Sequence, residues 1–146
     1  MQVGASDRER SEATAFHQMI PIFNPHNPSS EFFTEELCHI TELSNSPNDP
    51  EQSIARARVA PGITTRWHSL IDTTERYVVI SGQGIVEIGD LPSTAMNPLD
   101  VVIIPPGTRQ RITNIGTTDL VFLALCTPRF RPECYQDLDS TRIRRN

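Results

Sequence analysis

Lysine is absent from this sequence, because all 13 basic residues are arginines. Schiff-base chemistry and Walker-type phosphate loops both need a lysine, so neither is available to this chain. Any anion must instead be bound by arginine side chains or by backbone N–H groups. The formal net charge is -5, whereas a general nucleic-acid binder carries a basic surface that neutralises phosphates. We therefore expect no nucleic-acid partner.

Long apolar runs and paired cysteines are missing as well. No apolar stretch approaches the ~20 residues that a membrane-spanning helix needs, and no secretory signal pattern opens the sequence. The three cysteines, which are Cys38, Cys126 and Cys134, have neither a zinc-finger nor a redox spacing. These absences predict a reduced, cytoplasmic protein that has no membrane partner.

Proline and glycine interrupt the chain often, with 12 prolines and 7 glycines in 146 residues. Short runs rich in β-branched residues lie between these breakers at intervals of about ten residues, which is typical of an all-β fold. The length allows one domain with one core. We expect eight strands, over residues 37–43, 53–59, 64–70, 75–81, 85–89, 100–105, 109–115 and 120–126.

The first thirty residues differ from this pattern, because they mix polar residues, proline and asparagine without a sustained period. We interpret residues 1–30 as an N-terminal arm, either disordered or lying across a partner subunit, in front of a single domain over residues 31–146. The apolar arm residues, together with the outward-facing Val78 and Ile80, favour a homodimer that covers them. In the tail we expect at most a short helical turn over residues 136–143.

Two sets of residues at regular spacing indicate the fold family. The first set consists of Gly62, His68, Leu70, Glu75 and Gly82, and the second of Leu99, Pro105, Gly107, Gln110 and Asn114. In this order and spacing the chain resembles the cupin superfamily. The usual cupin motifs have a second histidine at the position of Leu70, a glycine at that of Leu99 and a third histidine at that of Gln110.

This resemblance extends from about Leu37 to Cys126 and implies a double-stranded β-helix, the cupin jelly roll, with about eight strands. Such a fold is open at one end, where a small molecule enters. We therefore expect a small-molecule ligand inside the barrel.

In metal cupins the motif histidines and glutamate converge on a metal inside the barrel. The corresponding ligands here are His68, Glu75 and Gln110, and the implied cofactor is a divalent transition metal such as iron, zinc, manganese or nickel. An amide oxygen is a weaker ligand than imidazole, and Leu70 cannot bind a metal. Three interpretations stay open: a bound metal, a metal-free polar pocket in which buried groups bind the ligand directly, and a vestigial site.

Alternation along strands assigns further side chains to the cavity. Arg66 shares a face with His68, and Tyr77 shares a face with Glu75. We predict that Arg66, Tyr77 and Gln110 bind substrate and that Glu75 and Tyr77 are catalytic. An inward Arg66 suits an anion such as a sugar phosphate or an organic acid, while the alternative is an ordinary pairing with a surface carboxylate.

Among cupins, the chain is similar to small single-domain proteins described as mannose-6-phosphate isomerase-like. The resemblance therefore implies a metal-assisted, isomerase-like enzyme acting on a small polar or anionic substrate. A non-catalytic module that binds or senses a small molecule is the alternative, because the ligand set is incomplete. A non-heme iron dioxygenase is a further alternative, although such sites usually rely on the imidazoles missing here.

Overall fold

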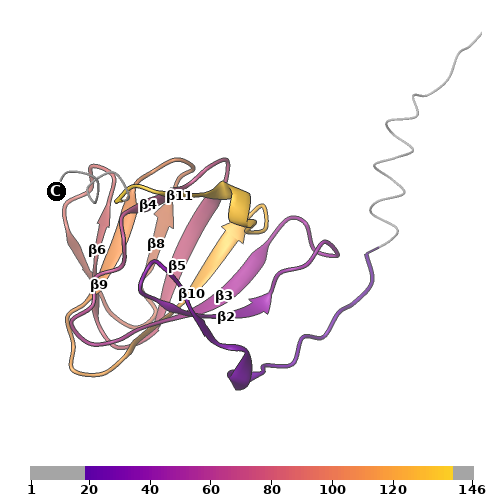
Figure 1. The fold of residues 1–146 in the computed structure, drawn as a ribbon, viewed down its shortest axis with the longest axis horizontal. Coiled ribbons are helices and arrows are strands. Elements are labelled where there is room, and N and C mark those ends of the chain that lie inside the picture. Colours follow the sequence, from indigo (N-terminus) through magenta and orange to yellow (C-terminus); the bar gives the residue numbers. More distant parts are fainter. Residues whose placement is uncertain (1–18, 140–146) are drawn as a thin grey trace, which may run out of the picture.

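The computed structural model describes residues 19–139, which form two antiparallel β-sheets packed face to face (Figure 1). The strands are β1 (Phe32–Phe33), β2 (His39–Ser44), β3 (Ser53–Val59), β4 (His68–Leu70), β5 (Thr74–Ser81), β6 (Gly84–Ile88), β7 (Thr94–Met96), β8 (Val101–Ile104), β9 (Gln110–Asn114), β10 (Leu120–Thr127) and β11 (Tyr135–Asp137). Two short 3₁₀ helices complete it, η1 (Pro28–Ser30) and η2 (Pro132–Cys134). No helix within residues 19–139 is long and apolar enough to cross a membrane.

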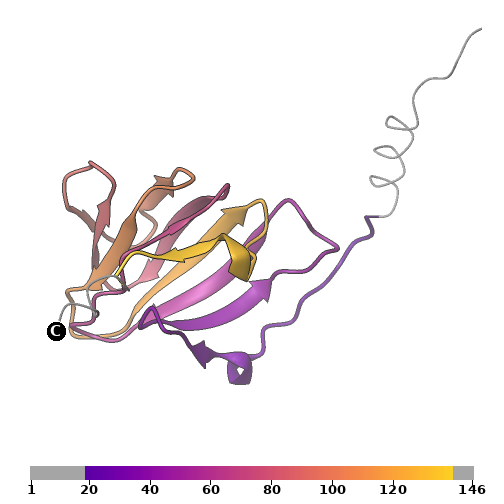
Figure 2. The same ribbon diagram turned by 45° about the horizontal axis from the view of Figure 1, so that its top comes forward.

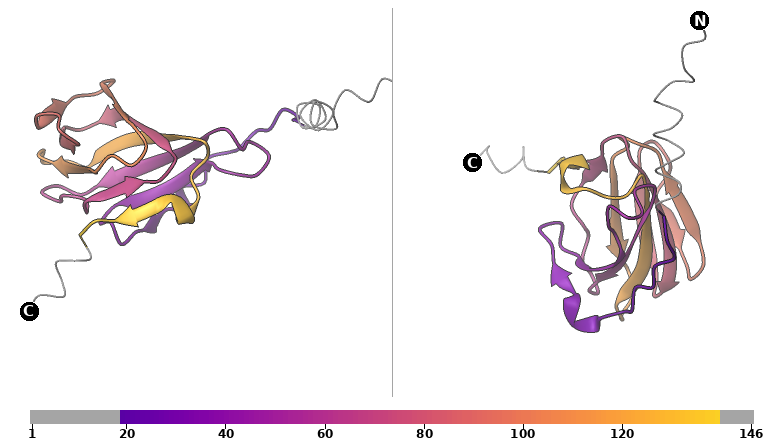
Figure 3. Two further views of the ribbon diagram at one scale, coloured as in Figure 1. Left: turned by 90° about the horizontal axis from the view of Figure 1, so that it is seen from above. Right: turned by 90° about the vertical axis from the view of Figure 1, so that its right-hand side faces the viewer.

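The two sheets have six and five strands. The larger has the order β1-β2-β3-β10-β5-β8, and the smaller has the order β11-β4-β9-β6-β7. Figures 2 and 3 show the sheets as two layers. This architecture confirms the all-β, double-stranded β-helix that the spacing of the motif residues predicts.

The core lies between the two sheets. Inward-facing residues alternate with outward-facing ones along the strands, as in β9, where Gln110, Ile112 and Asn114 are buried and the two residues between them are partly exposed. Strand β10 pairs with β3 on one side and β5 on the other, so it lies in the middle of the larger sheet. The largest fully buried aliphatic side chains are Ile104, Ile112, Leu120, Val59 and Val79.

Two of the motif residues have structural roles. Gly82 has a φ of +85°, and a Cβ there would lie 2.7 Å from the carbonyl oxygen of Asp119, so only glycine fits this turn. The buried Asn114 amide donates to the carbonyls of Val59 and Thr118, each at 2.8 Å. These two positions therefore fix the turns that align β5, β9 and β10.

The number of strands corrects the prediction, because the described residues contain eleven rather than eight. Strand β7 lies within the predicted loop 89–98, and β11 lies in the tail where only a helical turn was expected. The third predicted strand, 64–70, is shorter, since β4 begins at His68 and only an isolated bridge joins Thr64 to Thr113. These pairings depend on partners distant in sequence, which local patterns do not reveal.

The described part of the arm, residues 19–30, is exposed throughout, with Asn24 donating to the Ser44 hydroxyl at the end of β2 at 3.3 Å, and the chain before Asn24 leads away from the sheets (Figure 1). The rest of the predicted arm, residues 1–18, lies outside the described residues. Directly after the arm, Glu31 pairs with Arg58 at 2.6 Å and with Arg56 at 3.4 Å. This ion-pair network attaches the start of the domain to the outer face of β3.

Candidate functional site

The predicted site residues come from both sheets and meet between them. His68 on β4 lies directly opposite Gln110 on β9 in the smaller sheet, while Glu75 and Tyr77 project from β5 in the larger one. All four are buried, with exposed fractions of 4%, 1%, 8% and 4%, respectively. The motif spacing therefore leads to one buried polar cluster, although Leu70 fills the second histidine position with an apolar side chain.

Within the polar cluster, a hydrogen bond between two side chains joins the sheets. The Tyr77 hydroxyl donates to Oε1 of Gln110, and the Tyr77 ring packs on Phe122 with 4.5 Å between the ring centroids. Nε2 of Gln110 and Oε1 of Glu75 have no hydrogen-bond partner among the described residues. Buried polar atoms are normally satisfied, so these two atoms mark where a polar ligand or water would bind.

The His68 ring is held by its Nδ1 atom, which lies 2.9 Å from the carbonyl oxygen of Arg66. A carbonyl oxygen only accepts, so Nδ1 donates its proton and the neutral ring carries its lone pair on Nε2. Oε2 of Glu36 lies 3.5 Å from the same Nδ1, and the Tyr135 ring stacks on the imidazole at 5.2 Å. His68 thus has a fixed orientation and a basic nitrogen on its other edge.

Glu36 and Tyr135 were not among the predicted site residues. Glu36 belongs to the connection between β1 and β2, where its carbonyl accepts a hydrogen bond from the Arg66 amide at 3.1 Å, and Leu37 after it has a φ of +72°. Tyr135 is the first residue of β11, which pairs with β4. Neither segment has a strand period in the sequence, so no local signal identified them.

The cluster opens into two adjoining cavities. An inner cavity of about 50 Å³ is lined by His68, Glu75 and Tyr77, and an outer cavity of about 290 Å³ is lined by Phe32, Phe130 and Tyr135. Glu36, Ile40 and Glu75 line both. A small molecule entering the outer cavity therefore reaches the catalytic candidates at its inner end.

Burial controls the titration of the acidic groups. It raises the pKa of Glu75 above its ordinary value, and Glu36 adds to this shift while the nearby His68 opposes it. Burial likewise raises the pKa of Glu36, again against His68. The pKa of the Tyr77 hydroxyl is raised far above 10 by burial and by the Glu75 charge, so this hydroxyl keeps its proton. Burial therefore makes Glu75 a weaker acid than an exposed glutamate, and this carboxyl lines the same inner cavity as the His68 ring.

Arg66 does not share the cavity with these residues. Its guanidinium pairs with Asp137 on β11 at 3.1 Å, and it lines neither cavity. Alternation assigned it to the face of His68, but β4 begins only at His68, so the period does not extend to residue 66. Its role in substrate binding stays a prediction, and the arrangement resembles the alternative pairing with a carboxylate.

Residues 55–126 match the family described as Cupin domain. A protein of Methanocaldococcus jannaschii described as uncharacterized is 31% identical over 104 residues, which are 70% of this chain and 82% of that protein. The chain belongs to the cupin superfamily. A second relative of this cupin, a glucose-6-phosphate isomerase of Pyrococcus furiosus, is 35% identical over 63 residues, or 40% of this chain and 33% of that enzyme.

Solved structures share the fold of this cupin. KdgF from Halomonas sp. superposes with a TM-score of 0.67 at 16% identity, covering 78% of this chain and 98% of that one. Pac13, described as a nucleoside dehydratase, gives a TM-score of 0.65 at 17% identity, covering 80% and 92%. At these identities the likeness establishes the fold alone.

The donors of this cupin do not fit the metal that its family implies. Oε1 of Gln110, the expected third donor, accepts the Tyr77 hydroxyl proton, and the buried Leu70 puts an apolar side chain at the position of the second imidazole. Within residues 19–139, no group of three or more His, Cys, Asp or Glu side chains could hold a metal ion. A metal at His68, Glu75 and Gln110 therefore stays a prediction, and the polar atoms favour direct contact with an organic ligand.

Proposed function

We propose that this cupin is a metal-independent enzyme that transfers a proton within a small polar substrate, and that the reaction is an isomerisation. One observation carries the proposal: buried Glu75, whose Oε1 is unpartnered among the described residues, lines the same inner cavity as His68. Moving a proton between neighbouring atoms needs at least one group that donates a proton and one that accepts it, and both line this cavity.

His68 acts as the base in this proposal. Its Nε2 carries the lone pair because Nδ1 donates to the Arg66 carbonyl, and this nitrogen removes a proton from the carbon beside a substrate carbonyl. Glu75, whose pKa is raised by burial, donates a proton to the carbonyl oxygen. In the resulting enediol, protonated His68 returns its proton to the former carbonyl carbon while the hydroxyl on the neighbouring carbon gives its proton back to Glu75, so the new carbonyl forms there and both residues regain their starting states.

Tyr77 is a positioning residue rather than a proton donor here. Its hydroxyl proton is already donated to Gln110, which leaves the amide Nε2 of Gln110 as the free donor within the described part of the cluster. The isomerase name of the Pyrococcus furiosus relative supports the reaction class, although its match covers 33% of that enzyme. The neutral carboxyl also favours a second candidate, dehydration, because it can protonate a departing hydroxyl group.

Solvent deuterium exchange tests the reaction class on a panel of candidate substrates. The chelator-dialysed protein is incubated in D₂O with aldoses, ketoses, their phosphates and their 2-amino derivatives, and deuterium at carbon is followed by NMR. We expect exchange on at least one class. It should fall about 100-fold or more in His68→Gln and Glu75→Gln, as for loss of a general base or acid. The exposed Glu51→Gln is the matched control and should leave exchange unchanged.

The outcomes separate the alternatives. Exchange that appears only after adding iron, zinc, manganese or nickel would establish the metal-assisted enzyme instead. A compound that binds without exchange or product formation, across the whole panel, would establish a non-catalytic binding module. Loss of a substrate hydroxyl without isomerisation would identify the dehydratase.

A further inference from the structure

The outer cavity has an unbalanced charge. Four glutamates line it, namely Glu35, Glu36, Glu42 and Glu75, and no arginine or histidine of the described residues 19–139 joins them. The sequence has no lysine that could compensate. Carboxylates gathered around a cavity repel an anionic ligand and attract a cationic one. The lining therefore does not favour the sugar phosphate or organic acid expected from an inward Arg66.

The nearby arginines are bound to other acceptors. Arg66 pairs with Asp137, and Arg58 pairs with Glu31 and Asp119 on the outer face of the larger sheet. Arg129, after β10, donates to the Asn45 side chain at 2.9 Å. Arg129 and Arg131 line a different pocket, and none of these arginines lines the outer cavity, so they do not provide positive charge inside it.

A second observation points independently to a ligand. Glu75 lines both cavities and is only 8% exposed, and its Oε1 has no hydrogen-bond partner among the described residues. A buried carboxyl oxygen left unpaired is costly, and a ligand that donates a hydrogen bond removes this cost. The acidic lining therefore includes an acceptor at the position that a ligand would occupy.

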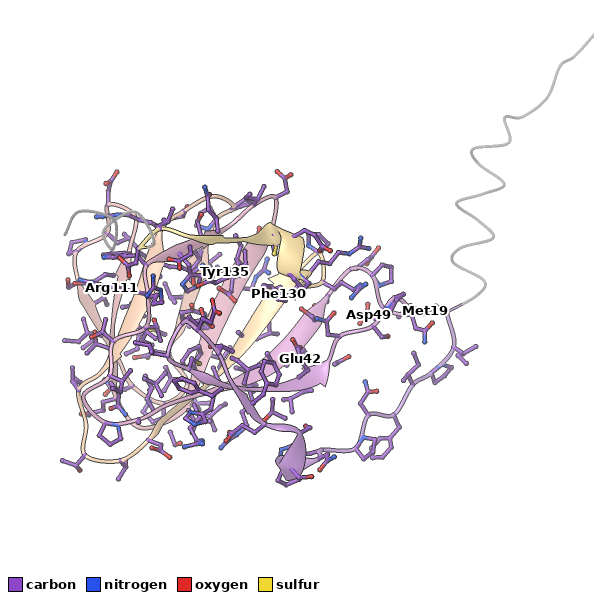
Figure 4. All side chains as sticks on the ribbon, in the orientation of Figure 1. Met19, Glu42, Asp49, Arg111, Phe130 and Tyr135 are labelled. Atoms are coloured by element: carbon purple, nitrogen blue, oxygen red, sulfur yellow. The ribbon has the colours of Figure 1, made fainter. Side chains whose placement is uncertain are left out.

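Aromatic side chains complete the lining. Phe32, Phe130 and Tyr135 come from β1, from the segment before η2 and from β11. Phe130, Tyr135 and Glu42 all line the outer cavity and are labelled in Figure 4, where Arg111 lies toward the left-hand end of the molecule. Aromatic faces attract cations through the ring quadrupole, and carboxylates nearby add a direct charge interaction.

We propose that the outer cavity selects a small organic substrate that carries an ammonium group, which the carboxylates and aromatic rings bind. This inference deepens the proposed function by naming the substrate class for the same site. The volume of about 290 Å³ corresponds to about ten water molecules at ~30 Å³ each, so a compound of the size of an amino sugar or an aromatic amine fits. A bare metal cation fits less well, because residues 19–139 offer no set of three suitable side chains.

Three compounds of one shape test the charge preference. Benzylammonium, benzyl alcohol and benzoate are titrated separately, with thermal shift and NMR chemical-shift changes as readouts. We expect benzylammonium to bind about ten-fold more tightly than benzyl alcohol, and benzoate to bind more weakly than both. Raising the ionic strength should weaken the binding of benzylammonium and leave the binding of benzyl alcohol unchanged. Equal binding of the alcohol, or tighter binding of benzoate, would overturn the proposal.

Variants locate the binding. Glu35→Gln and Glu42→Gln should each reduce benzylammonium affinity several-fold and leave benzyl alcohol affinity unchanged, while Glu51→Gln changes neither. Glu42 lies on the exposed rim, so its replacement does not endanger folding. Unchanged ammonium affinity in both glutamate variants would contradict the assignment to this cavity.

The two proposals fail separately. Benzylammonium preference without deuterium exchange on any compound would remove the enzymatic function and keep the ligand class. Exchange on neutral sugars with no preference for the ammonium compound would keep the enzymatic function and remove the proposed ligand class. Exchange confined to the 2-amino derivatives would support both.

Discussion

Glu31 and Glu75 are the same residue type in opposite surroundings. Glu31, on the outer surface, binds two arginines, and its hydrogen bond to Arg58 lowers its pKa. Glu75, in the cavity, has no basic partner at hydrogen-bond distance among the described residues, and burial raises its pKa. The outside of this barrel pairs its acids with arginine, whereas the acids of the two cavities, within the described residues, have His68 nearby and no arginine in the lining.

This difference changes how the composition is interpreted. Thirteen arginines in the sequence indicate a protein able to bind anions, and alternation placed one of them in the site. In the structure the arginines near β3 and β4 pair with Glu31, Asp119 and Asp137. The sign of the charge inside the cavity depends on which acids remain unpaired, which composition does not reveal.

The largest effect is expected at a part of the outer surface that carries exposed apolar side chains and not ion pairs. Val101 and Ile103 on β8 are 56% and 60% exposed, in the same sheet as the exposed Ile80 on β5. We expect this apolar edge to lie in a homodimer interface. Val101→Glu combined with Ile103→Glu should shift the protein from dimer to monomer, measured by light scattering. The control Ile71→Glu, at an exposed apolar residue that lines a different pocket, should leave the oligomeric state unchanged, and a monomeric wild type would contradict the prediction.

The second largest effect is expected from removing the buried hydrogen bond between Tyr77 and Gln110. Gln110→Leu leaves the buried Tyr77 hydroxyl without its acceptor and should reduce the free energy of unfolding by about 1–3 kcal/mol. Urea denaturation measures this loss. The double variant Tyr77→Phe/Gln110→Leu should lose less than the sum of the two single variants, because it leaves no unpaired hydroxyl. If the losses of the two single variants add up in the double variant, the hydrogen bond between Tyr77 and Gln110 does not contribute to the free energy of unfolding.

The third effect concerns Glu31 on the outer surface. Its pKa is lowered in the folded protein, so its ion pairs stabilise the fold above the ordinary value of 4.5, and this stabilisation is lost as pH falls through the folded pKa. Glu31→Gln should therefore cost about 1 kcal/mol at pH 7 and nothing near pH 3. Urea denaturation at the two pH values measures the difference, and an equal cost at both would contradict the ion-pair origin.

The smallest effect has the opposite sign and concerns Glu42 on the cavity rim. Burial raises its pKa, so the folded protein loses stability as pH rises from 4.5 through the raised value. Because water screens this exposed side chain, Glu42→Gln should stabilise the protein at pH 7 by only about a few tenths of a kcal/mol. No gain is expected below about pH 4. Paired thermal unfolding curves decide the sign, and destabilisation at pH 7 would contradict it.

The central strands could be predicted from the sequence because they combine a regular period with clear breakers. Strand β3 has the predicted bounds, and β5, β6, β9 and β10 lie within one residue of them at each end. The motif spacing also predicted that His68, Glu75 and Gln110 point into one cavity; all three are buried, with His68 opposite Gln110, but Gln110 lines neither of the two cavities. These features are local in sequence, or follow from strand alternation, so a single sequence suffices to predict them.

The remaining part of the site depends on contacts between distant segments. Glu36 reaches His68 from an irregular connection, and Tyr135 reaches it from a three-residue strand that exists only through pairing with β4. Arg66 shows the converse, because alternation applied before the strand begins gave it a cavity position that the chain does not adopt. Alternation fails just outside the end of a strand, because residues there no longer have the pairing that keeps side chains alternating.

Strand β11 has a consequence for how this protein could change over time. It forms one side of the outer cavity, through Tyr135, yet it follows the last core strand and, within the described residues, pairs with β4 alone. Substitutions or length changes there can alter ligand preference while the barrel between β3 and β10 keeps its packing. The tail is therefore a segment in which new specificity can arise by mutation at little cost to folding, and a natural region to vary in a library for altered ligand binding.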